Sequence, residues 1–344
     1  MLRVSAGTAH LLGLKKSKVD ALPTTAYLMT DGKCLRDCGF CPQSRSSTAR
    51  TDLLSRVTWP TFQEETACAA LRGKAAGNEG GPGEDFKRIC LQVVDTADWQ
   101  EQVRLFMEEL RGPDRQLKPD QQSWVTRETG RILPPVCIAC HPRNLSEVRE
   151  IFALGAERLG IALDAATPRL YAAVKGGSWQ RTFDLLTEAA LEFPGRISTH
   201  LIVGLGETEA EMVEAMDRLI RQGVTIGLFA FTPIRGTALE DRPRPSLGAY
   251  RRIQAARWLL LCGAGAEKFS FDGEGRLTSF GLTREELRRR LAGGEAFQTS
   301  GCPDCNRPYY NESPGGVIYN YPRPLTAAEA ARALDELEMD GATK

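Results

Sequence analysis

The sequence has 344 residues, in which 44 lysines and arginines balance 44 aspartates and glutamates, and 42% of its residues are hydrophobic. This composition is typical of a soluble globular protein with ample core, built as one barrel or as two domains. A net charge of zero excludes the electrostatic footprint of nucleic-acid binding, so we expect no nucleic-acid partner. No apolar run reaches the roughly 18 residues that span a bilayer, so we expect no membrane association.

The first residues, Met1 to Ser5, lack a charged segment followed by an apolar one, so we expect no secretory signal and a cytoplasmic location. The ten cysteines are not expected to form disulfides in a reducing compartment. Clustered cysteines should instead be metal ligands or catalytic thiols, and their spacing distinguishes the two.

Short β-branched and apolar runs alternate with longer amphipathic stretches, which is the pattern of βα units around a parallel sheet. The predicted strands are 25–30, 88–95, 135–140, 158–163, 197–203, 225–231 and 268–272. The predicted helices are about 60–76, 99–111, 144–154, 179–191, 207–222, 246–262 and 284–292. This number of repeats predicts an α/β fold with a (β/α) TIM-like barrel, partial or full.

The periodicity ends near residue 293, and a stretch rich in glycine, proline, tyrosine and asparagine follows from Gln298 to Pro324. We therefore predict an N-terminal extension over 1–20, a barrel over 21–293 and a C-terminal extension over 294–344. The C-terminal extension carries two cysteines, and we expect it to fold over the barrel mouth.

Cys34, Cys38 and Cys41 form a C-x3-C-x2-C motif directly after the first predicted strand. Three thiolates from one loop can hold three irons of a four-iron cluster and leave the fourth iron open to a chelating substrate. Structural zinc is the alternative, but it needs four closed ligands and usually has two paired spacings. The motif therefore predicts a 4Fe-4S cluster.

This spacing, with Phe40 before the last cysteine, resembles the radical S-adenosylmethionine (SAM) superfamily. In that family the methionyl amino and carboxylate groups of S-adenosyl-L-methionine chelate the open iron. One electron from the cluster then generates a 5'-deoxyadenosyl radical, which abstracts hydrogen from an unactivated carbon. The resemblance implies that Cys34, Cys38 and Cys41 are the catalytic cluster ligands, at the C-terminal mouth of the barrel.

The segment from His200 to Thr208 is a predicted strand that ends in glycines before a helix, so its backbone can approach a flat ligand closely. It resembles the adenine-contacting motif of the family. Asp164, at the end of another predicted strand, is expected by resemblance to accept ribose hydroxyls, with a helix cap as the alternative. The residues expected to bind the nucleoside cofactor are Phe40, Asp164, His200, Gly204, Gly206 and Glu207.

The segments 38–44, 88–91 and 231–237 resemble the biotin synthase branch of the superfamily. In that branch a second cluster in the barrel, held by three cysteines and an arginine, supplies sulfur. Cys90 and Cys137 stand at the matching strand positions, whereas Ser198 and Lys268 stand where the third cysteine and the arginine are expected. We therefore expect that this two-iron cluster is not built.

Two C-x2-C pairs, Cys137/Cys140 and Cys302/Cys305, take its place as candidate metal ligands. Two such pairs favour a four-thiolate site, and we expect it to hold an auxiliary Fe-S cluster, 4Fe-4S rather than zinc. Cys90 could substitute for one of the four ligands. Cys68 and Cys262, on predicted helices, are expected to be small buried apolar residues.

The tail segment 301–322 resembles that of biotin synthase relatives that act as two-protein, archaeal-type lipoyl synthases. This implies a radical SAM sulfurtransferase that inserts sulfur into an octanoyl chain at C6 or C8, with the auxiliary cluster as donor. The implied partners are a homologous second subunit, an octanoylated lipoyl carrier protein such as glycine cleavage protein H, and an electron donor such as ferredoxin or flavodoxin. Arg307, Tyr309 and Tyr310 are candidates for binding carrier or cluster, and tail packing explains the tyrosines equally well.

Three other functions stay open at this point. The first is a biotin synthase, which Ser198 and Lys268 oppose. The second is a radical enzyme that rearranges carbon bonds and uses the remaining cysteines for zinc or a structural cluster. The third is a metal-binding scaffold protein that never cleaves SAM.

Overall fold

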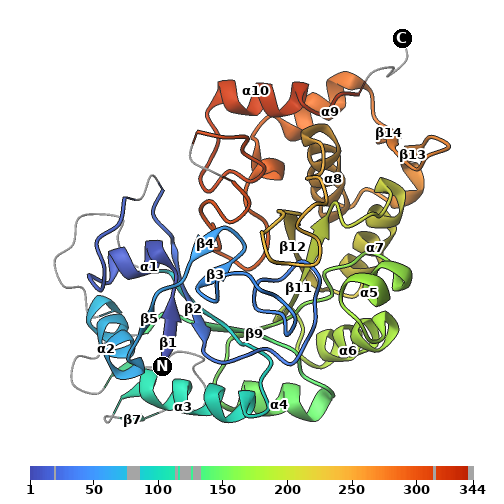
Figure 1. Ribbon diagram of the computed structural model, residues 1–344. Coiled ribbons are helices and arrows are strands. Elements are labelled where there is room, and N and C mark those ends of the chain that lie inside the picture. The colour runs from blue at the N-terminus through green and yellow to red at the C-terminus, as the bar shows by residue number, and fades with distance from the viewer. Residues whose placement is uncertain are drawn as a thin grey trace. The chain divides into compact units, whose positions relative to one another are not determined.

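The structure is a computed structural model that describes residues 1–18, 21–75, 86–112, 115–116, 125–126, 133–312 and 315–339. The chain divides into two compact units. Unit 1 comprises Met1–Ala162, Ile234–Ala238 and Pro303–Tyr310, and unit 2 comprises Leu163–Pro233, Leu239–Cys302 and Asn311–Lys344. Helices and strands alternate in both units (Figure 1). The predicted division into an extension, a barrel and a second extension stays a prediction.

Unit 1 is built on a sheet with the strand order β5-β1-β2-β6-β9-β10. Strands β2, β6, β9 and β10 are parallel, whereas β1 runs antiparallel to both of its neighbours. All six residues of β2 are buried, as expected for a parallel strand covered on both faces. The bounds are β1 Leu2–Val4, β2 Thr25–Thr30, β5 Thr61–Phe62, β6 Arg88–Gln92, β9 Val136–Cys140 and β10 Arg158–Ile161.

The helices of unit 1 are α1 Ala6–Leu11, α2 Glu64–Ala75, α3 Trp99–Arg111 and α4 Leu145–Ala153. In Figure 1, α2, α3 and α4 follow one another along one flank of this unit. Helix α3 buries Val103, Phe106 and Leu110, the apolar positions of a helical period. Helix α4 begins at Asn144, whose side chain accepts a hydrogen bond from Glu147 N at 3.0 Å. Two-residue strands complete the unit: β3 Leu53–Leu54, β4 Val57–Thr58, β7 Arg115–Gln116 and β8 Val125–Thr126.

Unit 2 contains the parallel strands β11 Ile197–Val203 and β12 Thr225–Ala230. Helix α7 begins with a reciprocal capping box between Thr208 and Glu211. The helices are α5 Pro168–Val174, α6 Trp179–Glu192, α7 Glu209–Arg221, α8 Leu247–Leu261, α9 Arg284–Leu291 and α10 Ala327–Asp335. Short elements are the 3-10 helices η1 Ala266–Lys268 and η2 Glu295–Phe297, and the hairpin of β13 Ser270–Phe271 with β14 Leu277–Ser279.

The part of the tail that belongs to unit 2 is fastened to β12 and α8. Ser300 Oγ accepts a hydrogen bond from Leu228 N at 2.8 Å, and the Asn311 amide donates to Ala230 O at 2.8 Å. The buried Arg251 guanidinium of α8 donates to Tyr319 O at 2.7 Å. Tail side chains thus satisfy backbone groups along β12 and cover part of its edge.

Predicted and observed elements agree closely in most of the chain. The strands predicted over 25–30 and 197–203 have those bounds, and four others are slightly shorter than predicted. Of the strand predicted over 268–272, only Ser270–Phe271 is a strand, and it pairs in a hairpin with β14 that is closed by a turn at Gly275, while Lys268 ends η1. No helix within the described residues combines the length and apolarity needed to cross a membrane.

Candidate active site

The cysteine loop, residues 31–47, follows β2 and stands at the carboxyl ends of β2 and β6 in unit 1. Leu35 N donates to Asp95 O at 2.8 Å, and Arg36 Nε donates to the Asp95 carboxylate at 2.8 Å. Asp95 follows shortly after β6. The loop that carries the three predicted catalytic cysteines is therefore anchored to the neighbouring strand of the sheet.

Two consecutive tight turns set the spacing of the cysteines. Cys41 N donates to Cys38 O at 3.0 Å, and Ser44 N donates to Cys41 O at 3.1 Å. Cys38 is buried, whereas Cys34 and Cys41 are half-buried. Gly32, before the first cysteine, has φ +116°, and a Cβ there would lie 2.8 Å from the Thr96 side chain. Only glycine fits this position without displacing its neighbour.

The far end of the loop packs against the segment Ile234–Ala238 of unit 1. Gly236 O accepts hydrogen bonds from Thr48 N at 2.9 Å and from Ser47 Oγ at 3.1 Å. Gly236 has φ +87°, and a Cβ there would lie 2.5 Å from Ala49 N. Within unit 1, Gly236 therefore supports the cysteine loop.

The donor set of the loop fits a four-iron cluster. All ten cysteines lie in described residues, and none of them is in a disulfide. Within the described residues no three His, Cys, Asp or Glu side chains gather closely enough to hold a single metal ion. A four-iron cluster spaces its thiolate ligands more widely than a single ion does. Three thiols in one anchored loop therefore suit a cluster with one iron left for SAM better than they suit zinc.

A second group of thiols, Cys90, Cys137 and Cys305, lies in unit 1 outside the loop. Tyr27, Cys90 and Cys137 are partners in the register of β2, β6 and β9, so they share one face of the sheet. Cys305 Sγ lies 3.4 Å from the Tyr27 hydroxyl. We call Cys90, Cys137 and Cys305 the second thiol group.

Two guanidinium groups contact the second thiol group. Arg88 Nη1 donates to Cys137 Sγ at 3.1 Å, and Arg307 Nη1 donates to Cys305 Sγ at 3.4 Å. Burial would lower the pKa of Arg88, but the charges of Cys137 and Glu157 raise it. Positive charge next to a thiol favours the thiolate, which is the form that binds iron.

Two phenols beside these thiols stay protonated. Burial raises the pKa of Tyr27 well above its ordinary value, and a charge on Cys305 raises it further. Burial also raises the pKa of Tyr310, with the charge of Cys90 adding to the effect. The two rings lie 5.9 Å apart. Tyr27 and Tyr310 therefore give the second thiol group an apolar wall with neutral hydroxyls.

The sequence predicts that Cys137 and Cys140 bind the same metal site, but the structure directs the two thiols apart. The two residues are three apart on β9, so their side chains point to opposite faces of the strand. Cys140 is buried, and burial together with the charges of Glu147 and Asp95 raises its pKa. Cys90, which the sequence analysis names as a possible replacement for one of the four ligands, lies beside Cys137 instead.

Cys302 and Cys305 differ in their surroundings. Cys305 belongs to the second thiol group of unit 1, whereas Cys302 belongs to unit 2 and has its Sγ 3.6 Å from Ser198 Oγ. Ser198 is the residue that stands where the biotin synthase branch has its third cysteine. In unit 2 the tail therefore brings a thiol to the strand position that lacks one.

The tail segment Pro303–Tyr310 does not begin at the predicted barrel mouth. Arg88 Nε donates to Pro303 O at 3.0 Å, and Thr25 Oγ1 donates to Asp304 O at 3.1 Å. Arg88 and Thr25 are the first residues of β6 and β2, at the opposite end of these strands from the cysteine loop. Pro303 and Asp304 therefore lie at the amino-terminal ends of the strands, away from the predicted mouth, whereas Tyr310 O accepts a hydrogen bond from Ser55 Oγ at 2.6 Å, beyond the cysteine loop.

In unit 2, Glu207 holds the glycine turn that follows β11. Its carboxylate accepts hydrogen bonds from Gly204 N at 2.6 Å and Leu205 N at 3.0 Å. Burial raises the pKa of Glu207, and the backbone donors oppose that shift. Gly204 and Gly206 have φ +103° and +116°, which favours glycine. Glu207 thus shapes the backbone that is expected to meet the adenine.

Asp164 makes a contact that the sequence did not predict. Its carboxylate lies 2.7 Å from Lys175 Nζ, and the Lys175 side chain is 0% exposed. Asp164 has φ +63°, and its N–H donates to His200 O at 2.8 Å. The His200 ring stands edge-on to Phe229, with centroids 5.0 Å apart. Asp164 is thus part of a buried ion pair next to β11 rather than a helix cap, since Thr167 caps α5.

Several residues that surround the site were not singled out from the sequence: Arg3, Gln43, Lys175, Tyr27 and Arg88. Gln43 and Arg88 lie inside motifs that carry the family resemblance, so the sequence could have indicated them as candidate site residues. Arg3 and Tyr27 contact partners 28 and 278 positions away in the sequence, which no local pattern reports, whereas Lys175 is 11 positions from Asp164. Phe40, which was singled out, is half-buried in the cysteine loop.

Comparison with known proteins agrees with this geometry. A family model described as "Radical SAM superfamily" matches residues 30–219, more than half of the chain. A lipoyl synthase of Koribacter versatilis is 24% identical over 212 residues, which cover 59% of this chain and 58% of that protein. A lipoyl synthase of Citrifermentans bemidjiense is 40% identical over 57 residues, which cover 16% and 20% respectively. The matched part is less than two thirds of the length of each relative.

Among solved structures, HydG, a maturase of the [FeFe]-hydrogenase, aligns with a TM-score of 0.51 and 12% identity over 77% of this chain and 54% of that chain. This likeness shows the fold alone. Together with the family match it confirms the predicted α/β class with a largely parallel sheet.

Proposed function

The chain belongs to the radical SAM superfamily, and we propose that it is a sulfurtransferase of the lipoyl synthase type. In this proposal it is one subunit of a two-protein enzyme that inserts sulfur into an octanoyl chain on a lipoyl carrier protein. The names of two relatives of low coverage support the reaction class.

The observation that carries the proposal is the second thiol group. A radical enzyme that only rearranges carbon needs no thiols beyond its loop, whereas a sulfur donor does. In this group Arg88 donates to Cys137 and Arg307 donates to Cys305, so two guanidinium groups are in place to offset the negative charge of a bound cluster. We propose that this group holds the auxiliary Fe-S cluster.

The remaining predicted auxiliary ligands carry less weight in this proposal. Cys302 stays a proposed ligand because it lies only three positions before Cys305 in the sequence. Cys140 is replaced by Cys90, since Cys140 points to the other face of β9 and its thiol is disfavoured from ionising.

When bound, a four-iron cluster with SAM supplies a carbon-centred radical that abstracts hydrogen, and an auxiliary cluster supplies sulfur. The residues of the cysteine loop have the task of holding three thiolates and keeping one face open. In unit 2, the turn at Gly204 and Gly206 offers backbone to the adenine. Asp164 and His200 stay proposed contacts of the nucleoside, with Lys175 fixing the Asp164 carboxylate.

The proposed partners follow from the chemistry of the reaction. They are a homologous second subunit, an octanoylated carrier such as glycine cleavage protein H, and an electron donor such as ferredoxin or flavodoxin.

The proposal is tested by iron and sulfide analysis with Mössbauer spectra on anaerobically reconstituted protein. About eight irons per chain are expected for two four-iron clusters. A variant with Cys90, Cys137 and Cys305 all changed to serine should keep about half of this iron and still form 5'-deoxyadenosine. A variant with Cys34, Cys38 and Cys41 changed to alanine should keep the other half and form none.

The opposite result is equally informative. Wild-type protein that binds only the loop cluster, with zinc or nothing at the second thiol group, would remove the sulfur source and leave a radical enzyme of another kind. Turnover of dethiobiotin in place of an octanoyl carrier would favour a biotin synthase.

A further inference from the structure

We propose that Arg3 is a positioning residue that ties the two ends of the cysteine loop together and so sets the relative positions of the three cluster thiols. The inference rests on the loop holding the radical-generating cluster and does not depend on sulfur transfer. All the residues involved belong to unit 1.

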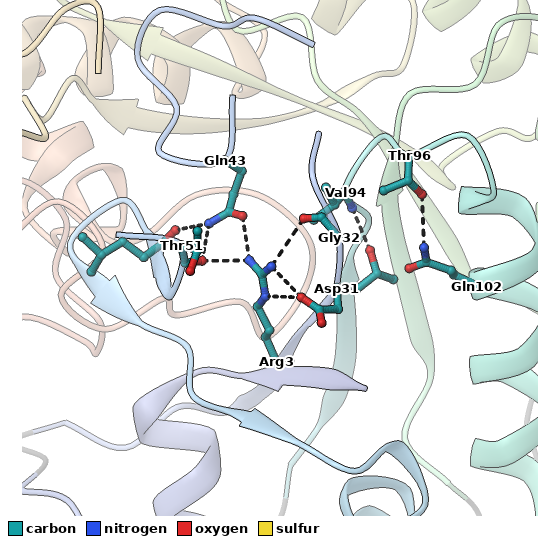
Figure 2. Close-up of polar contacts among 10 residues, drawn as sticks. Arg3, Asp31, Gly32, Gln43, Thr51, Val94, Thr96 and Gln102 are labelled. Atoms are coloured by element: carbon teal, nitrogen blue, oxygen red, sulfur yellow. Dashed lines mark hydrogen bonds and ion pairs between the residues drawn. The ribbon is translucent and has the colours of Figure 1, made fainter. Parts of the chain in front are cut away.

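Arg3 reaches the start of the loop from β1. Its Nε and Nη2 atoms donate to Asp31 Oδ1 at 2.9 and 2.6 Å, and Nη2 also lies 3.4 Å from Gly32 O. Figure 2 shows the guanidinium between these residues and the far side of the loop. Gly32 is two residues before Cys34, so the contact fixes the chain just ahead of the first thiol.

The same guanidinium also reaches the end of the loop. Its Nη1 atom donates to Gln43 Oε1 at 2.6 Å and to Thr51 O at 2.8 Å. Gln43 is two residues after Cys41, and its amide donates to Thr51 O at 2.8 Å and Leu53 O at 2.6 Å (Figure 2). Arg3 and Gln43 thus fix the chain just behind the last thiol.

Only arginine can make this set of contacts. A guanidinium has five N–H donors in a rigid fork, and the contacts of Arg3 use all three of its nitrogen atoms. The Arg3 side chain is 8% exposed and its hydrogen bond to Gln43 is buried, whereas its partner Asp31 is 44% exposed. Lysine keeps the charge, but its three donors sit on one nitrogen and cannot reproduce the forked contacts that reach Asp31, Gln43 and Thr51 from three separate nitrogens.

The three thiols lie between the two points that Arg3 joins. The turns at Cys38 and Cys41 fix the local spacing of two thiols, but they do not fix how Cys34 stands relative to Cys41. A backbone hydrogen bond from Arg45 N to Arg36 O at 2.8 Å joins the chain behind Cys34 to the chain behind Cys41. Arg3 adds a second constraint, because it connects Asp31–Gly32, ahead of Cys34, to Gln43. A small displacement of one thiolate moves the open iron relative to bound SAM, and catalysis is sensitive to such misplacement.

The test compares Arg3→Lys, Gln43→Met and the double variant with the wild type. In apoprotein, amide hydrogen exchange over residues 33–47 should be faster in each variant, while exchange in β6 and β9 stays unchanged. In reconstituted protein, SAM should change the EPR spectrum of the reduced cluster less than in the wild type. Formation of 5'-deoxyadenosine without acyl substrate should fall about tenfold or more in kcat, with a smaller change in KM for SAM.

The double variant tests whether Arg3 acts through Gln43. If it does, the double variant should be no worse than the poorer single variant. Arg50→Lys is the matched control, because Arg50 lies just beyond the same loop and its side chain is 70% exposed in a pair with Asp52. This control should match the wild type in exchange, EPR spectrum and rate.

Two results would overturn the proposal. The first is that Arg3→Lys and Gln43→Met match the wild type in amide exchange of the loop, in the EPR response to SAM and in kcat. The second is that the variants are less stable throughout, but the protein that still binds iron has the wild-type EPR spectrum and rate. That result would mean that Arg3 has a purely structural role. A wild type that forms 5'-deoxyadenosine but inserts no sulfur would refute the proposed function and leave this inference intact.

Discussion

The buried pair of Lys175 and Asp164 gives the sharpest stability prediction. Its charged atoms are 2.7 Å apart, and the side chains are 0% and 10% exposed. At an effective dielectric constant of about 20, the gross attraction at this distance is about 6 kcal/mol. Replacing Lys175 by methionine keeps an unbranched side chain of similar size, one atom shorter, but leaves the Asp164 carboxylate buried without its cation. We expect the free energy of unfolding to fall by about 3–5 kcal/mol.

The prediction is measured by urea unfolding of the apoprotein under anaerobic conditions. The double variant Lys175→Met with Asp164→Asn should regain much of the loss, because no buried charge is left unpaired. Arg221→Met is the control, since Arg221 is 62% exposed in its pair with Asp217 and its replacement should change the free energy of unfolding little. A cost below about 1 kcal/mol for Lys175→Met would mean that water reaches the pair, and the reasoning would fail.

Three further predictions concern thiol reactivity, pH and the cysteine loop. Iodoacetamide should label the exposed Cys262 in native apoprotein but not Cys68, whose pKa burial raises; equal labelling would contradict this. Hydrogen bonds from Arg323 lower the pKa of Glu329 to about 2, so its stabilisation is present above about pH 4.5 and is lost as pH falls toward 2. The difference in Tm between wild-type apoprotein and Glu329→Gln should therefore narrow below that pH, and a constant difference would refute the assignment. Gly236→Ala should lower iron binding by the loop, whereas Gly263→Ala, with similar φ but open space around it, should not; equal effects would mean that backbone strain alone matters.

The parallel strands and the cysteine loop could be predicted because their signals are local. Strand β2 is an apolar run bounded by polar residues, and the cysteine spacing lies within eight consecutive residues. Two missed helices also carried local signals. Thr167 and Pro168 are a cap and a first-turn proline at the start of α5, and Thr326 with Glu329 forms a capping box at α10.

The second thiol group could be predicted only in part. The alternation of side chains along a strand already separates Cys137 from Cys140, so their pairing was avoidable. The position of Cys305 could not be predicted from the sequence, because it depends on a contact with Tyr27, more than 270 residues away in the chain. Cys262 was expected to be buried, yet it is exposed because it lies past the last turn of α8, at its C-cap.

The edge strand β1 was missed for a related reason. Three residues carry too little alternation to indicate a strand, and the pairing of Arg3 with Met29 of β2 is a tertiary contact. The role of Arg3 depends on that pairing, since β1 brings its side chain to the cysteine loop. The residues that hold the loop in place are therefore harder to read from sequence than the cysteines themselves.

The most direct test of sulfur transfer uses protein reconstituted with isotopically labelled sulfide. The sample is given SAM, a low-potential reductant, an octanoylated carrier domain and the homologous subunit, and the product is analysed by mass spectrometry after one turnover. The proposal predicts labelled sulfur on the octanoyl chain and loss of sulfide from the protein. It also predicts that Cys305→Ser abolishes the label while 5'-deoxyadenosine still forms. Unlabelled product, or turnover with no loss of sulfide, would contradict it.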